Sequence, residues 1–250
     1  MKRQRLRRII LASLFLVFPL VFNYFSPYLM ITGAAERVIT TSAIVWGLYL
    51  LSGVVFGRAA CGWFCPFSAL QMLWDKVAPK PLRRVRFLPW VKYVLWAGWV
   101  VAFVAILASG SGPLRFDPLY STPNLVSIDS PGNNITYFGL IALVMVPVLI
   151  AGKRGFCHHL CPFAGWMVAG TAVRDAVKLP SLHLESDPAA CNGCGRCEGE
   201  CPMSLPVGAM AAKGDMHSVD CILCGRCIDS CKRGALRYAY RWGARDGGPA

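Results

Sequence analysis

The chain has 250 residues, of which 55% are hydrophobic and only 16% are charged, and its formal net charge is +13. A chain of this length ordinarily forms one or two domains. The composition is too apolar for a soluble protein, yet polar stretches interrupt the apolar ones too often for a chain that is embedded in the membrane throughout. The positive charge could indicate nucleic-acid binding. However, the Lys and Arg residues lie beside apolar segments, where retention on the cytoplasmic face explains them more simply.

Four apolar segments predict transmembrane helices, at residues 9–31, 38–56, 88–109 and 135–151. Each approaches the roughly 20 residues that cross the hydrocarbon core. The last is short, and Pro147 is expected to kink it. The first segment follows the basic stretch MKRQRLRR and could also be read as a signal peptide. Its length and the lack of a convincing cleavage site favour a helix.

The distribution of basic residues predicts the orientation of these helices. Lys and Arg gather at the amino terminus, after the second segment and after the fourth: Lys2, Arg3, Arg5, Arg7, Arg8, Lys76, Lys80, Arg83, Arg84, Arg86, Lys153 and Arg154. The positive-inside rule therefore places both termini in the cytoplasm. We expect a multi-pass protein of the bacterial inner (cytoplasmic) membrane. The loop at residues 110–134 then faces the opposite side.

An internal repeat lies within the membrane part. The ten residues from Arg58 to Phe67 (RAACGWFCPF) align without a gap on those from Arg154 to Phe163 (RGFCHHLCPF), and each copy follows a predicted helix pair. Two such units predict a pseudo-twofold arrangement with both turns on the cytoplasmic side. Residues 1–180 are thus predicted to form an all-α membrane domain of four transmembrane helices in two repeated pairs.

Two four-cysteine groups follow, and they have the spacing of bacterial proteins with two [4Fe–4S] clusters. In that pattern, the fourth Cys of each group ligates the other group's cluster. The first predicted cluster has the ligands Cys191, Cys194, Cys197 and Cys231. The second has the ligands Cys221, Cys224, Cys227 and Cys201. Zinc also uses paired cysteines, but the doubled pattern favours iron. We therefore predict a small α+β ferredoxin domain at residues 181–240 and a tail at 241–250.

Two further cysteine pairs, each followed by proline, lie next to the membrane helices: Cys61, Cys65, Cys157 and Cys161. A spacing of four places each pair on one side of a helical turn, and Pro66 and Pro162 suit the start of a following helix. The four thiols could hold a third iron–sulfur centre, or they could be reduced thiols that pack or work as a redox pair. His158 and His159 could bind quinone, relay a proton or ligate a metal, or simply be interfacial.

These motifs together resemble the NapH/MauN family of ferredoxin-type membrane proteins and, more distantly, the carboxyl-terminal region of NosR and the CcoG/RdxA proteins. The order of parts matches over nearly the whole chain: Cys61-Gly-Trp-Phe-Cys65-Pro66, Cys157-His-His-Leu-Cys161-Pro162, then the two four-Cys groups. The resemblance implies the membrane component of a quinol dehydrogenase. Its substrate would be quinone from the membrane pool, and its partner a periplasmic ferredoxin-type subunit, a multihaem cytochrome or a dehydrogenase or reductase complex.

Electron transfer between the quinol pool and a partner redox protein is therefore the preferred prediction. An electron-supplying maturation factor for a metalloenzyme, which would reduce copper or a cofactor precursor, is the alternative, and a redox-sensing scaffold is a third hypothesis. The sequence shows no acid–base dyad, nucleophile triad or phosphate loop. We therefore predict no catalytic residues for chemistry beyond electron transfer.

Overall fold

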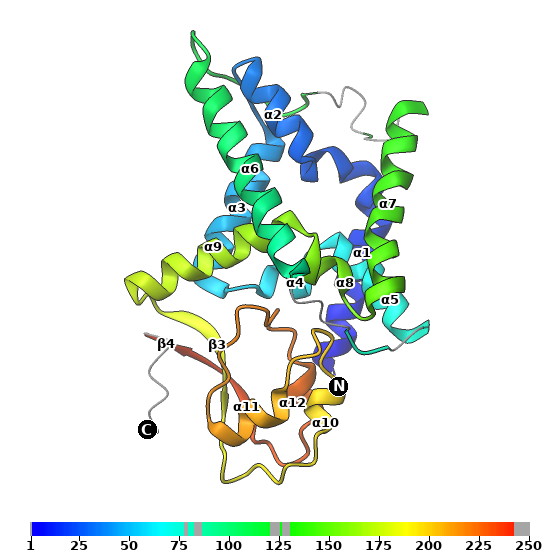
Figure 1. The fold of residues 1–250 in the computed structure, drawn as a ribbon, viewed down its shortest axis with the longest axis vertical. Coiled ribbons are helices and arrows are strands. Elements are labelled where there is room, and N and C mark those ends of the chain that lie inside the picture. The colour runs from blue at the N-terminus through cyan, green and yellow to red at the C-terminus, as the bar shows by residue number, and fades with distance from the viewer. Residues whose placement is uncertain (1, 78–79, 83–86, 121–125, 127–130, 243–250) are drawn as a thin grey trace.

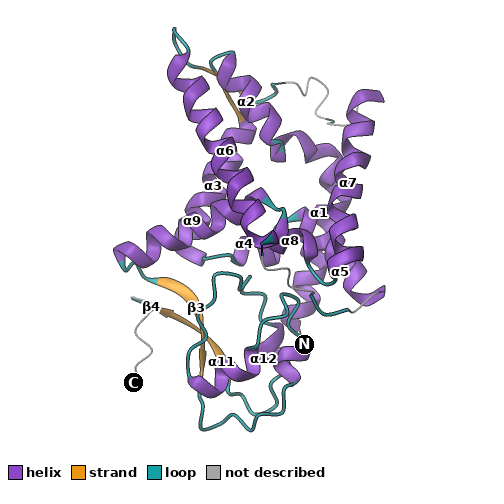
Figure 2. Cartoon of the chain, in the orientation of Figure 1, coloured by secondary structure: helices purple, strands orange, loops and turns teal. Residues whose placement is uncertain are grey.

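The computed structural model describes residues 2–77, 80–82, 87–120, 126 and 131–242. Helices dominate the part that precedes residue 181 (Figures 1 and 2). Its elements are α1 (Lys2–Val21), the 3₁₀ helix η1 (Phe22–Phe25), α2 (Pro27–Ala35), β1 (Val38–Thr40), α3 (Thr41–Phe56), α4 (Ala59–Trp63), α5 (Pro66–Val77), α6 (Leu88–Ser109), β2 (Arg115–Asp117), α7 (Pro131–Ala151), α8 (Gly155–His159) and α9 (Pro162–Val177). The predicted tail at 241–250 and the basic residues at 83–86 lie almost entirely outside the described residues.

Three segments of the described chain are long and apolar enough to cross a membrane: Lys2–Ala35, α6 and α7. The second predicted segment becomes α3, an apolar helix of 16 residues, because residues 38–40 instead form β1, which pairs in parallel with β2. A fourth crossing by α3 thus stays a prediction, as does the pseudo-twofold repeat.

The first predicted helix, at residues 9–31, is interrupted in the structure. α1 ends at Val21, η1 follows, and α2 starts at Pro27 after Ser26, whose hydroxyl accepts a hydrogen bond from the Leu29 amide at 3.4 Å. Proline has no amide hydrogen and fits the first turn of a new helix better than the interior of a continuous one. The physical cause of the break is therefore visible in the sequence, although hydropathy alone predicts one helix.

α3 and α9 pack closely against each other. α3 ends shortly before the turn that carries Cys61 and Cys65, and α9 starts directly after Cys161. Gly53 and Gly170 lie where the two helices touch, since a Cβ on Gly170 would approach the Leu50 carbonyl oxygen to 2.7 Å. Small residues at such positions let helix backbones approach one another. Beside them, Trp46 stacks on Phe163 with ring centroids 3.9 Å apart, so an aromatic core joins the two helices.

The remaining part of the chain forms a small α+β module below the helices in Figure 1. Its elements are β3 (Ser181–Ser186), α10 (Arg196–Gly199), α11 (Val207–Lys213), α12 (Arg226–Ser230) and β4 (Leu236–Arg241). β3 and β4 pair antiparallel, with Ser181 opposite Arg241 and Ser186 opposite Leu236. The pairing brings both ends of the module together and leaves the two four-Cys groups in the loops and short helices between the strands.

Candidate iron–sulfur sites and the junction between them

The first cavity of the module has a volume of about 250 Å³ and opens at its surface. Cysteines from both four-Cys groups line it: Cys191, Cys194, Cys197 and Cys231. Gly195 precedes α10 with a φ of +67°, a left-handed conformation that glycine adopts without strain. This turn brings Cys194 and Cys197 to one cavity, together with Cys231 from 34 residues further along the chain.

The second cavity lies deeper in the module. Its cysteines are Cys201, Cys221, Cys224 and Cys227. Apolar side chains such as Leu184, Met203 and Ile222 line the rest of it. Burial raises the pKa of Cys221 to about 12, so this thiol keeps its proton at neutral pH unless a metal displaces it. Each cavity therefore combines three cysteines of one group with the last cysteine of the other.

The donors of both cavities are cysteine thiols. Among the described residues, no group of three or more His, Cys, Asp or Glu side chains is placed to hold one metal ion. The four thiols of each set instead surround a volume, and thiolates are the ligands that iron–sulfur clusters use. The donor set of each cavity thus fits a cluster, and the first cavity, of about 250 Å³, also has the space for one.

The membrane-proximal cysteines lie together in the helical part. Cys61 is in α4 and Cys157 is in α8, and their partners Cys65 and Cys161 immediately precede α5 and α9, which begin at the prolines as the sequence predicts. All four side chains are buried. Burial raises the pKa of Cys65, and the charges of Cys61 and Cys157 raise it further. The two turns therefore bring the four thiols close enough to interact.

Buried arginines surround these thiols. Arg58 and Arg154, three residues before Cys61 and Cys157, are only 2% and 1% exposed. Arg154 donates to the Ser68 hydroxyl, but its Nε and Nη2 have no hydrogen-bond partner among the described residues. A buried cation is costly unless an anion lies beside it. The cationic surroundings therefore suit thiolates better than four neutral thiols. Both arginines belong to the repeat, and Arg154 also contributes to the predicted orientation, but the sequence predicted no role for either one beside the cysteines.

Asp220 connects this cluster of thiols with the ferredoxin module. Its Oδ1 accepts hydrogen bonds from Arg58 at 3.1 Å and from Lys92 of α6 at 3.2 Å, and its Oδ2 lies 4.0 Å from His158 Nδ1. Burial acts to raise the pKa of Asp220, but these positive charges outweigh it and leave the pKa below its usual value. Because Asp220 precedes Cys221, one half-buried carboxylate connects both cysteine regions.

His158 and His159 are both buried beside these cysteines. His158 Nε2 lies 3.1 Å from the Met203 carbonyl oxygen. Burial lowers the pKa of His158 to about 4, so its ring is neutral at neutral pH. Its second nitrogen faces Asp220, so His158 is held by the module on both edges. A role for either histidine in quinone or proton binding stays a prediction.

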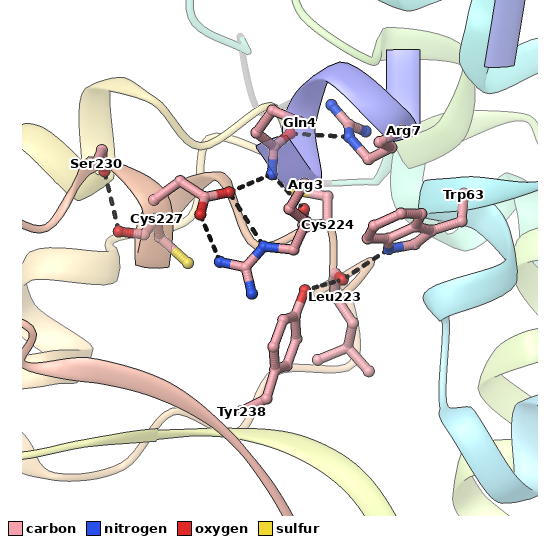
Figure 3. A network of polar contacts seen from close by, with 10 residues as sticks. Arg3, Gln4, Arg7, Trp63, Leu223, Cys224, Cys227, Ser230 and Tyr238 are labelled. Atoms are coloured by element: carbon pink, nitrogen blue, oxygen red, sulfur yellow. Dashed lines mark hydrogen bonds and ion pairs between the residues drawn. The ribbon is translucent and has the colours of Figure 1, made fainter. Parts of the chain in front are cut away.

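The contact between the module and the helices is dense (Figure 3). Arg3 binds Asp229 through two nitrogens, at 2.6 and 3.2 Å, and its guanidinium lies over the Tyr238 ring. The Leu223 carbonyl oxygen accepts from both Trp63 Nε1 and the Tyr238 hydroxyl. Leu223 lies between two cysteines of the second cavity, and Trp63 lies between Cys61 and Cys65, so the two cysteine regions are in direct contact.

Gly62 makes this contact possible. A Cβ on Gly62 would collide with the carbonyl oxygen of Ile222. The Gly62 carbonyl oxygen, in turn, accepts a hydrogen bond from the buried Arg7 side chain at 3.1 Å. Sequence reasoning missed Gly62, Asp220 and Arg7 because their roles arise only where the module meets the helices. The position of Gly62 between Cys61 and Cys65 was the one feature of the sequence that could have indicated such a role.

The fold and the cysteine sites define a ferredoxin-type iron–sulfur protein with helices able to span a membrane. A 4Fe–4S dicluster domain family matches residues 190–236, and a 4Fe–4S binding domain family matches residues 38–86 and 135–168. The second match includes both membrane-proximal cysteine pairs. The chain is thus an iron–sulfur electron-transfer protein.

Curated relatives confirm the resemblance to the NapH family of ferredoxin-type proteins. The ferredoxin-type protein NapH of Haemophilus influenzae is 28% identical over 78% of this chain and 67% of its own length. An uncharacterized protein of Methanocaldococcus jannaschii is 27% identical over 96% of this chain and 89% of its own. The putative electron transport protein YccM of Escherichia coli is 23% identical over 82% of this chain, which spans only 57% of YccM. No solved structure matches the chain.

Proposed function

We propose that this protein passes electrons between the membrane quinol pool and a partner redox protein, as one component of a respiratory or dehydrogenase system. The observation that carries the proposal is the arrangement of three sets of four cysteines: two sets line cavities in the module, and the turn between Cys61 and Cys65 of the third set contacts the loop between Cys221 and Cys224. Relatives named as ferredoxin-type and electron transport proteins support the same function.

The ligand assignment follows the two cavities. Cys191, Cys194, Cys197 and Cys231 would hold one [4Fe–4S] cluster, and Cys201, Cys221, Cys224 and Cys227 the other. When bound, such clusters supply one-electron oxidation and reduction at potentials that burial and hydrogen bonds adjust. The chain's own residues exclude water from the second site with an apolar lining and leave the first open, so the first site is the better placed to meet a soluble partner.

A third centre at Cys61, Cys65, Cys157 and Cys161 is part of the proposal. Arg58 and Arg154 support it, because buried guanidinium groups beside four thiols stabilise negative charge there. Gln71 adds a hydrogen bond from its Nε2 to the Cys157 sulfur at 3.1 Å. These polar groups would hold an anionic centre and would have little reason to gather around neutral packing thiols.

The proposed orientation in the membrane determines which partners the protein can meet. With the module in the cytoplasm of a bacterium and the chain in the inner membrane, the opposite side would meet a periplasmic ferredoxin-type subunit, a multihaem cytochrome or a dehydrogenase or reductase complex. Arg37 and Arg115 are the basic residues on that side in the described chain, against many at the module side. Accessibility labelling of single cysteines introduced near each end of α6 tests this orientation.

Reduction by quinol is the decisive experiment. The anaerobically purified protein is placed in lipid nanodiscs, mixed with a reduced menaquinone or ubiquinone analogue, and followed by visible bleaching and low-temperature EPR. The expected result is reduction of the iron–sulfur centres at a rate proportional to quinol concentration. Centres that dithionite reduces but quinol never does, together with a partner enzyme that lacks its metal cofactor when this protein is deleted, would establish the maturation role instead.

A further inference from the structure

A polar cavity of about 360 Å³ lies between the start of α1, the middle of α5 and the ends of α10 and α12. Its lining includes cations, carboxylates and one thioether, among them Arg7, Arg8, Met72, Asp75, Glu200 and Arg226. None of the candidate cluster ligands lines it. The cavity is therefore distinct from the two cysteine cavities, and it lies at the level where the module meets the helices.

Asp75 is the unusual member of this lining. Both of its carboxylate oxygens are buried, and neither has a hydrogen-bond partner among the described residues. The other two carboxylates of the lining are paired, Glu200 with Arg226 at 2.7 Å and Asp229 with Arg3 at 2.6 Å. A buried, unpaired carboxylate is unfavourable unless something else donates to it. Its position in a cavity indicates that the donor is a ligand.

Four cations from three segments of the chain surround Asp75. Arg7 of α1, Lys153 and Arg154 before α8, and Arg226 of α12 face it. Burial raises the pKa of Asp75 above its usual value, although these cations act to lower it. A carboxylate shifted in this direction is a better proton acceptor than one in water.

The cavity also borders both cysteine regions. Arg226 and Glu200 line it and directly precede Cys227 and Cys201, which belong to the second module cavity. Arg7 lines it too and donates to the carbonyl oxygen of Gly62, in the turn between Cys61 and Cys65. A molecule in the cavity would thus contact two residues, Glu200 and Arg226, each of which is adjacent in sequence to a proposed cluster ligand.

Exposed apolar side chains lie on two of the helices that line the cavity, α1 and α5. Leu6 and Ile9, on the same turns of α1 as Arg7 and Arg8, are 55% and 56% exposed, and Leu73, beside Met72, is 50% exposed. Exposed apolar side chains beside a polar cavity suit a ligand with a polar ring and a long hydrocarbon tail. A water-soluble ligand would gain nothing from these side chains.

We propose that this cavity binds the ring of a membrane quinol and that Asp75 accepts a proton from one of its hydroxyl groups. The inference deepens the proposed function and rests on it. In the reaction both hydroxyl O–H bonds break and the ring becomes a quinone. Oxidised iron–sulfur centres, when bound by the proposed cysteine ligands, would accept the two electrons one at a time. Asp75 accepts one proton, and the other goes to solvent at the open side of the cavity. His158 and His159 do not line this cavity.

The test compares Asp75→Asn with Asp117→Asn, a matched change in β2, on the other side of the helices, where the Asp117 side chain accepts from the Leu119 amide. Asp75→Asn is expected to slow reduction by quinol by roughly 10²-fold, the usual contribution of a positioned proton acceptor, while reduction by dithionite and the iron content stay unchanged. Asp117→Asn should match the wild type. Asp75→Glu, which keeps the carboxylate, should recover a substantial part of the rate.

A binding measurement gives a readout that needs no turnover. The fluorescent quinol analogue 2-heptyl-4-hydroxyquinoline N-oxide should bind Asp75→Asn about tenfold more weakly than the wild type, the loss expected for one hydrogen bond to a charged group. Unchanged analogue binding and unchanged quinol rates in Asp75→Asn would overturn the proposed site and leave the electron-transfer function standing. A wild-type protein that quinol never reduces would instead overturn the function itself, and the quinol site with it.

Discussion

The ferredoxin module and the membrane-proximal turns use the same side chain in two different environments. In the module, Cys194 is exposed and Cys191 and Cys197 are half-buried, and the first cavity opens to solvent. At the turns, Cys61, Cys65, Cys157 and Cys161 are all buried, and Arg58 and Arg154 lie beside them. Solvent screens charge at the first module cavity, whereas fixed cations would have to balance negative charge at the turns. The comparison teaches that the same thiol side chain can be surrounded by water in one region and by buried counter-charges in another.

The largest effect should follow from removing one module cysteine. Cys201→Ser deprives the second cavity of its distant fourth thiol, and the folding free energy that the cluster supplies is lost with it. We expect loss of about half the module iron and susceptibility of the module to protease, measured by iron and sulfide analysis and limited proteolysis. Unchanged iron content would mean that the fourth ligand does not cross between the two groups.

The double variant Cys61→Ser with Cys157→Ser sharpens the comparison from the other side. If the turns hold a third [4Fe–4S] centre, purified wild-type protein contains about twelve irons and the variant about eight, with the EPR signals of the module unchanged. The apolar and aromatic packing around the turns keeps the helices in place. A wild-type count of about eight irons would show that these thiols only pack.

Arg154 tests whether counter-charge matters at the turns. Arg154→Met keeps most of the volume and removes the guanidinium that faces Cys157. We expect a loss of roughly 1.5–3 kcal/mol of support for the negatively charged centre, the range for hydrogen bonds to charged groups, and therefore a lower reduction potential or partial loss of iron. Arg154→Lys should retain more of both. A redox titration in which the methionine and lysine variants behave alike would argue against an electrostatic role.

Gly62 tests the direct contact between the two regions. Gly62→Ala places a methyl group against the Ile222 carbonyl oxygen, so the module must shift, at a cost of about 1–3 kcal/mol. Gly98→Ala is the matched control, because a Cβ there meets nothing within 4 Å. Thermal unfolding in detergent should show a lower midpoint for Gly62→Ala alone. Equal midpoints for both variants would mean that the module is not pressed against the turn.

The smallest effect concerns the surface contact of the module with α1. Arg3→Ala removes the ion pair between Arg3 and Asp229, whose side chains are 30% and 19% exposed, respectively. Solvent screening limits its contribution to about 0.2–1 kcal/mol, and that contribution should fall as salt is added. Protease protection of the module at low and high salt measures it. A large, salt-independent loss of protection would show that α1 holds the module by more than charge.

The amino-acid sequence by itself determined the apolar helices, the ferredoxin-type module and the starts of α5 and α9 at Pro66 and Pro162. These features depend on local composition and spacing, which a linear pattern records. Even the break before α2 had a local cause in Pro27, although average hydropathy concealed it.

Only the tertiary structure decided how the two cysteine regions meet. Asp220, Gly62 and Arg7 act across gaps of more than 50 residues: Asp220 with Arg58, Gly62 with Ile222, and Arg7 with Gly62. Asp75 is an ordinary polar residue of an amphipathic helix until the module and α1 enclose it. Burial and counter-charge are properties of the packed chain, because they depend on which distant groups remove the water, and no spacing of letters specifies that.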